Sequence, residues 1–168
     1  MRRTAGLFGA LLIIGLGLAT LPGIVSAENY SWEINEDFVP ELKKPGMGVY
    51  SLDLSGGFIG FACIKNESIS DFTAVVSEKP ENRYEPGTYT VRVTIDHSTE
   101  LTSTWQEAPR PNRDLGLALG GQPAYDLAQA IARAKRRIMV RTPRGIISND
   151  LNGAASAITQ LLKFCQIS

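Results

Sequence analysis

The chain has 168 residues, with 17 basic and 17 acidic side chains and a single histidine. This length corresponds to one ordinary domain with its own core, and the sequence contains no internal repeat and no low-complexity segment. One histidine and two cysteines are too few for a typical zinc site, and no acidic residues have the spacing of a calcium loop. We therefore expect no metal and no cofactor.

Residues 1–27 have the three-part layout of a secretory signal peptide. Arg2 and Arg3 precede a long apolar run, which ends in the small-residue sequence Val25-Ser26-Ala27. Cleavage after Ala27 by the Sec pathway is expected, which leaves residues 28–168 as a single β-rich periplasmic or secreted domain with no transmembrane segment. The alternative is that the apolar run is retained as a membrane anchor.

Export changes the interpretation of the two cysteines, Cys63 and Cys165. In an oxidising compartment an even pair of cysteines favours a disulfide over a redox or metal site, and the wide spacing excludes a CxxC motif. A Cys63–Cys165 bond would close a loop of about 100 residues, which stabilises a fold by up to about 4.7 kcal/mol in the chain-entropy model.

The first half of the exported domain alternates short apolar segments with polar turns, which is typical of β-strands. After an extended lead-in, the expected strands are 30–34, 49–54, 58–64, 72–77, 88–95 and 101–106, with 49–54 and 58–64 as a hairpin. The segment TYTVRVTI at 88–95 is the clearest, because its apolar and polar residues alternate strictly. Residues 78–87 are expected to form a surface loop.

The second half is expected to contain an edge strand at 115–119, an amphipathic helix from Pro123 to about 138, strands at 138–142 and 146–151, and a last helix from 154 to 165. In that last helix the predicted buried stripe is Ala154, Ala155, Ile158, Leu161, Leu162 and Cys165. The sequence therefore predicts an α+β fold: an antiparallel β-sandwich or open barrel with two α-helices in the C-terminal half, the last tied to a strand by the disulfide.

Charge is distributed unevenly along the chain. Residues 28–109 contain 14 acidic and 6 basic side chains, whereas residues 110–168 contain 3 acidic and 9 basic ones. Either the two halves attract each other within the domain, or a basic face binds an anionic partner. The candidate binding residues are Arg133, Lys135, Arg136, Arg137, Arg141 and Arg144; their alternative role is a solvated helix end that complements the helix dipole.

Catalytic motifs are absent from the sequence. Asp96-His97-Ser98 contains the residue types of a hydrolase triad, but adjacent residues cannot face one another in that geometry, and no serine lies in a GxSxG elbow. A turn is the better interpretation. Acids such as Glu36, Asp37, Glu78 and Glu81 are expected to be solvated loop residues, and Trp32 and Trp105 to be packing residues.

Several features of the second half together suggest a family. They are Cys63 in a buried strand, an aliphatic strand followed by Arg141-Thr142-Pro143-Arg144-Gly145, then Asp150-Leu151-Asn152-Gly153, and an Ala/Leu helix that ends at Cys165. Over roughly residues 58–165 the chain thereby resembles small periplasmic proteins of the VasI-like kind, which are associated with type VI secretion. The resemblance implies a β-rich domain with a disulfide-anchored helix and no known enzymatic activity.

The leading hypothesis is a non-catalytic exported protein that binds or supports another cell-envelope component, as an accessory of a secretion system. Its partner would be an envelope protein or an anionic envelope component rather than nucleic acid, which an exported protein has little reason to meet. A periplasmic hydrolase or hydrolase inhibitor is the alternative. An enzyme needs polar groups that converge in a cleft, whereas a binding module needs an exposed apolar or single-sign patch.

Overall fold

The computed structural model describes residues 32–36, 45–65, 67–78, 84–108 and 116–166. The predicted signal peptide, its cleavage point after Ala27 and most of the lead-in lie outside these ranges. None of the helices within them is long and apolar enough to cross a bilayer.

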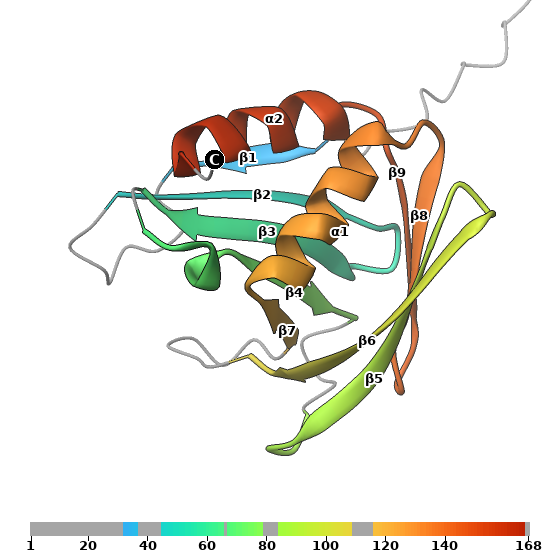
Figure 1. The fold of residues 1–168 in the computed structure, drawn as a ribbon. Helices are drawn as coiled ribbons and strands as arrows, with labels where there is room; N and C mark the ends of the chain where they lie inside the picture. Colours follow the sequence, from blue (N-terminus) through green and yellow to red (C-terminus); the bar gives the residue numbers. More distant parts are fainter. Residues whose placement is uncertain (1–31, 37–44, 66, 79–83, 109–115, 167–168) are drawn as a thin grey trace, which may run out of the picture.

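Within the described ranges, nine antiparallel strands form one sheet (Figure 1). In chain order they are β1 (Glu33–Asn35), β2 (Gly46–Leu52), β3 (Phe58–Ile64), β4 (Thr73–Ser77), β5 (Thr88–Ile95), β6 (Thr99–Glu107), β7 (Leu117–Gly120), β8 (Arg137–Arg141) and β9 (Ile146–Asp150). Their order across the sheet is β1-β2-β3-β4-β7-β6-β5-β8-β9. The predicted α+β class and the β2–β3 hairpin are confirmed. The segment at 115–119 was expected at an edge, but β7 lies inside the sheet between β4 and β6.

The sheet bends so that its last strand approaches its first two. Trp32 donates a hydrogen bond from Nε1 to the carbonyl oxygen of Asp150, at 3.2 Å. On the buried side, Asn149 Nδ2 of β9 donates to Ser51 Oγ of β2, at 3.1 Å. Both contacts join residues that are about 100 positions apart or more. Side chains therefore bridge the gap between the sheet edges, which is the geometry of an open barrel.

The described part of the chain also contains two helices and a short 3₁₀ turn (Ile69–Asp71). Helix α1 (Gln122–Arg133) packs against β4, β7 and α2, whereas α2 (Ala154–Cys165) packs against β2 and β3 (Figure 1). Both helices begin after a glycine at positive φ, Gly121 at 71° and Gly153 at 82°, a backbone conformation that glycine adopts without steric cost. The interior side chains of sheet and helices form one core, which contains Trp105, Phe61, Phe72, Ile131 and Ile158.

The predicted disulfide is present. Cys63 on β3 is bonded to Cys165 at the end of α2, across 102 positions of sequence, and both side chains are buried. The buried stripe of α2 consists of Ala154, Ala157, Ile158, Leu161 and Cys165. The prediction included Ala155 and Leu162 instead of Ala157; Ala155 is exposed and Leu162 only partly buried. The stripe is therefore rotated slightly from the predicted one.

Candidate functional site

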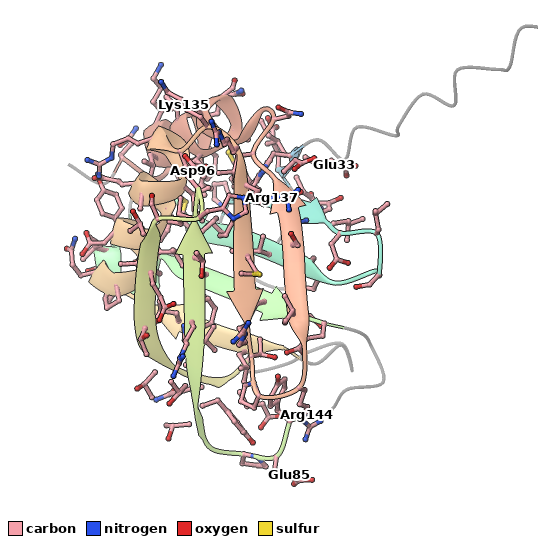
Figure 2. The ribbon with its side chains drawn as sticks, turned by 90° about the vertical axis from the view of Figure 1, so that its right-hand side faces the viewer. Glu33, Glu85, Asp96, Lys135, Arg137 and Arg144 are labelled. Atoms are coloured by element: carbon pink, nitrogen blue, oxygen red, sulfur yellow. A yellow bond between two sulfur atoms is a disulfide. The ribbon has the colours of Figure 1, made fainter. Side chains whose placement is uncertain are left out.

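The six basic residues predicted as a binding patch lie at two separate places along β8. Arg133, Lys135, Arg136 and Arg137 follow one another at the junction between α1 and β8, here called the basic junction. Arg141 is the last residue of β8, and Arg144 lies in the turn after it. Figure 2 shows Lys135 and Arg137 near one end of β8 and Arg144 at the other. The six cations therefore do not form one patch.

The backbone of the basic junction is held by Asp96, at the tip of the β5–β6 hairpin. Its carboxylate accepts hydrogen bonds from the backbone N–H groups of Lys135 (2.9 Å), Arg136 (2.8 Å) and Arg137 (3.2 Å) (Figure 2). In return, the N–H of Asp96 donates to the carbonyl oxygen of Arg137, at 3.0 Å. The N–H groups of Lys135 and Arg136, more than the nearby guanidinium of Arg136, hold the pKa of Asp96 below its usual 3.8.

This contact corrects the predicted length of the helix. Residues 134–138 were expected to continue it, with Lys135, Arg136 and Arg137 on its outer face, but α1 ends at Arg133 and Ala134 is extended. The carboxylate of Asp96 accepts from the N–H groups that further helical turns would have used, so a contact 39 to 41 positions away in sequence ends the helix. Only Arg133 remains at the helix end.

Two side chains of the basic junction also have local partners. Arg133 donates from Nε to the carbonyl oxygen of Gln129 and from Nη2 to its side-chain oxygen, both at 3.1 Å. Arg137 lies 3.9 Å from the carboxylate of Asp150, which is directly opposite on β9. Acidic groups and helix carbonyls thus lie among these four cations.

At the other end of β8, a buried carboxylate holds the turn. Glu78, only 5% exposed, accepts hydrogen bonds through Oε1 from the hydroxyls of Tyr84 (2.6 Å) and Thr142. Among the described residues, its second oxygen, Oε2, has no hydrogen-bond donor. Burial, followed by the hydrogen bond to Glu78, raises the pKa of Tyr84. Glu78 was expected to be solvated, and that prediction is wrong because the β8–β9 turn packs over it.

The turn itself is tightly braced. The hydroxyl of Thr142 accepts from the N–H groups of Arg144 (3.2 Å) and Gly145 (3.1 Å). The guanidinium of Arg144 lies 4.5 Å from the ring centroid of Tyr84, a cation–π contact. Arg144 is therefore engaged with the protein, while Arg141, the residue before Thr142, points to the other face of the sheet and is exposed.

Arg141 has a partner that the sequence did not suggest. The register of β5 and β8 places Arg92 directly opposite it, and both side chains are exposed. Like charges directly opposite on neighbouring strands repel. Within the described ranges, neither guanidinium forms a hydrogen bond or ion pair. Alternation along β5 did predict that Arg92 faces solvent, but only the strand register reveals what lies beside it.

Threonines surround the arginine pair on the same face of the sheet. Thr102 of β6 is opposite Arg92, and the next row contains Thr90 of β5 and Thr104 of β6. All three are exposed or nearly so, and in the described structure their hydroxyls have no hydrogen-bond partner. We call Thr90, Arg92, Thr102, Thr104 and Arg141 the arginine–threonine face. It belongs to the strands at the front of Figure 2.

A shallow depression marks this face. Its volume is about 380 Å³, and it is lined by Thr90, Arg92, Arg141, Thr142 and Pro143. Among the described residues, none of those that line it is acidic. Among the described residues of this face, Glu100 of β6 is the diagonal neighbour of Arg92: it lies opposite Thr94, one row beyond Thr102, and it makes no ion pair with Arg92. This surface is thus locally cationic and rich in free donors.

The Asp96-His97-Ser98 segment is a turn, as predicted. Asp96 and His97 have positive φ values of 50° and 63°, typical of a tight hairpin turn, and His97 is exposed. Because the backbone of the basic junction occupies the carboxylate of Asp96, this carboxylate is not oriented towards His97 as a triad acid would be. Within the described ranges, no group of three or more His, Cys, Asp or Glu side chains is placed to hold a metal ion.

Comparison with known protein families, with curated proteins and with solved structures finds no match for this chain.

Proposed function

We propose that this protein is a non-catalytic exported protein that binds an anionic component of the cell envelope through the arginine–threonine face. The observation that carries the proposal is the pair of Arg92 and Arg141, directly opposed and without an acidic partner in the described structure. Like charges directly opposite on neighbouring strands repel, and an external anion between the two guanidinium groups would relieve this repulsion.

Export is part of this proposal. The signal-peptide layout of residues 1–27 and the buried disulfide between Cys63 and Cys165 are both compatible with an oxidising compartment. The resemblance to VasI-like periplasmic proteins supports a role beside another envelope component, as an accessory of a secretion system.

The basic junction provides a matched control for the test. We would compare salt-gradient elution from a heparin column for the exported protein and two double variants, Arg92→Gln/Arg141→Gln and Lys135→Gln/Arg136→Gln. Each variant removes two positive charges, all from exposed side chains. Because exposed charges act mainly through local potential at physiological salt, position matters as well as number.

The proposal predicts that the Arg92/Arg141 variant elutes at a clearly lower salt concentration than the Lys135/Arg136 variant. Equal shifts for the two would show that retention depends on net charge alone, and would contradict a binding role for this face. Circular dichroism of all three proteins confirms that each is folded.

A further inference from the structure

We infer that the arginine–threonine face is a site for a single phosphate group, held between the guanidinium groups of Arg92 and Arg141. The inference rests on the proposed function and specifies the chemistry of its ligand. The spacing of Arg92 and Arg141 suits one anion between them. Directly opposed residues on antiparallel strands have Cβ atoms about 4.5–5.5 Å apart, so two long arginine side chains easily reach one anion between them.

The number and kind of hydrogen-bond donors on this face favour phosphate over carboxylate. Each guanidinium offers five N–H donors in a planar fork, and arginine is the side chain best suited to bidentate binding of phosphate or carboxylate. The hydroxyls of Thr90 and Thr102 lie next to the pair, and Thr104 lies beyond them. A planar carboxylate has only two oxygens to accept these hydrogen bonds. A phosphate group has more oxygens, arranged in three dimensions, and more negative charge.

The shape of the site admits one phosphate group and leaves one side open. The depression of about 380 Å³ is lined by both arginines and Thr90, and Pro143 forms its margin. This space is sufficient for one phosphate head group, while the open side leaves the remainder of a larger molecule in solvent. The expected ligand is therefore either free phosphate or a phosphate group displayed by a lipid or polymer, and the chemistry recognised is the same.

The strands that carry the two arginines are rigidly held by the core beneath them. On the inner face, beneath the arginines, Val91, Val93 and Val140 are almost completely buried. The residue after Arg141 is Thr142, whose hydroxyl is bonded to Glu78 and to the backbone of the turn. The two Cα positions are thus fixed before a ligand arrives, and only the side chains need to become ordered, which reduces the entropy lost on binding.

The decisive test is a titration of the exported protein with inorganic phosphate, followed by NMR chemical shifts of the amide and arginine side-chain N–H groups. We expect saturable shifts at Arg92, Arg141 and the neighbouring threonines, and weaker binding of acetate at equal concentration. Arg92→Gln and Arg141→Gln should each lower phosphate affinity at least tenfold. Arg137→Gln removes the same charge from the same face of β8, four residues away, and should change affinity less than twofold.

A lysine substitution separates recognition by the guanidinium from simple attraction. Arg141→Lys keeps the charge but loses the planar fork, so we expect it to weaken phosphate binding several-fold. Unchanged binding by Arg141→Lys, or equal losses in Arg141→Gln and Arg137→Gln, would overturn the inference. Acetate binding as tightly as phosphate would also overturn it, as would a wild-type protein that shows no shifts with phosphate.

The source of the phosphate is tested in a second arm. Sedimentation with vesicles that contain phosphatidic acid is compared with vesicles of phosphatidylcholine alone, each for wild type and Arg92→Gln/Arg141→Gln. Capture only by phosphatidic acid, lost in the double variant, identifies a displayed phosphomonoester; binding of inorganic phosphate without vesicle capture identifies a free ligand. Heparin retention that depends on Arg92 and Arg141 without any phosphate binding would leave the proposed function standing and refute this inference alone.

Discussion

The two ends of β8 are each fixed by one carboxylate, but in opposite ways. At the basic junction, Asp96 lies at the surface and accepts hydrogen bonds from three backbone N–H groups. At the β8–β9 turn, Glu78 is buried, and one of its oxygens accepts hydrogen bonds from two side-chain hydroxyls. The first arrangement brings a carboxyl group among the cations, whereas the second keeps its carboxyl group buried on the inner side of the sheet.

This difference decides which cations can serve an external partner. The densest run of basic residues in the sequence, Arg133 to Arg137, includes an intramolecular carboxylate at its centre and a second one, Asp150, at its edge. Arg92 and Arg141 are 49 positions apart in sequence, yet they form a pair that makes no ion pair with an acidic side chain in the described structure. Density of charge along a chain is therefore a poor guide to an anion site.

The largest expected effect concerns a feature remote from both ends, the disulfide. Replacing Cys63 and Cys165 together by alanine should lower the free energy of unfolding by about 2–5 kcal/mol, because the unfolded chain loses its cross-link and buried sulfur contacts disappear. Urea denaturation at pH 7 measures this. In the protein without the disulfide, the Arg92/Arg141 variant should still elute from heparin at a lower salt concentration than the Lys135/Arg136 variant. Loss of that difference would show that the two ends of β8 depend on α2.

The next effect tests the buried anchor. Glu78→Ala should lower the free energy of unfolding by about 1–3 kcal/mol, because the hydroxyls of Tyr84 and Thr142 lose a buried acceptor. Glu85→Ala, a change of an exposed glutamate one residue after Tyr84, is the control and should have little effect. If both variants unfold at the same urea concentration, Glu78 does not anchor the turn, and the rigid support assigned to Arg141 is wrong.

The surface anchor has a distinct dependence on pH. Asn tolerates positive φ, so Asp96→Asn keeps the hairpin turn while removing the charge that the three N–H groups bind. The folded-state pKa of Asp96 lies below the ordinary 3.8, so its charge contributes stability above pH 3.8, and this contribution is lost as pH falls through the folded-state value. The variant should therefore be less stable than wild type at pH 7.

Urea midpoints of wild type and Asp96→Asn, measured between pH 7 and pH 2, provide the check. The difference should be constant near neutral pH and should shrink in the acid range; Glu100→Gln, on the neighbouring strand, is the control for loss of one exposed carboxyl group. A gap that persisted unchanged at pH 2 would mean that the carboxylate charge is not what holds the basic junction.

Local patterns predicted the elements well. The strictly alternating segment 88–95 and the predicted strand 58–64 coincide with β5 and β3, and the predicted last helix, 154–165, coincides with α2. The disulfide also followed from sequence, because a chain that is expected to be exported and has only two cysteines offers one pairing. These features depend on residues close in sequence or on a count.

The errors share a different cause. The end of α1, the burial of Glu78 and the interior position of β7 are all set by residues far away: Asp96, the β8–β9 turn, and the strands β4 and β6. The candidate site fails in the same way, since Arg141 was predicted but Arg92 was not. Strand register is a tertiary property, and period-two alternation specifies only the face on which a side chain lies.

The smallest effect is also the most specific to the comparison. Since directly opposed like charges destabilise a sheet, Arg92→Gln should raise the free energy of unfolding by roughly 0.2–1 kcal/mol at low salt while it weakens anion binding. Arg137→Gln should instead lower the free energy of unfolding, by less than about 1 kcal/mol, because it breaks a solvent-exposed ion pair with Asp150. Thermal unfolding at 10 and 500 mM NaCl would resolve the signs, and both effects should fade at high salt. If Arg92→Gln lowered the free energy of unfolding, the two guanidinium groups would not repel each other. Relief of their repulsion could then not favour the binding of an anion.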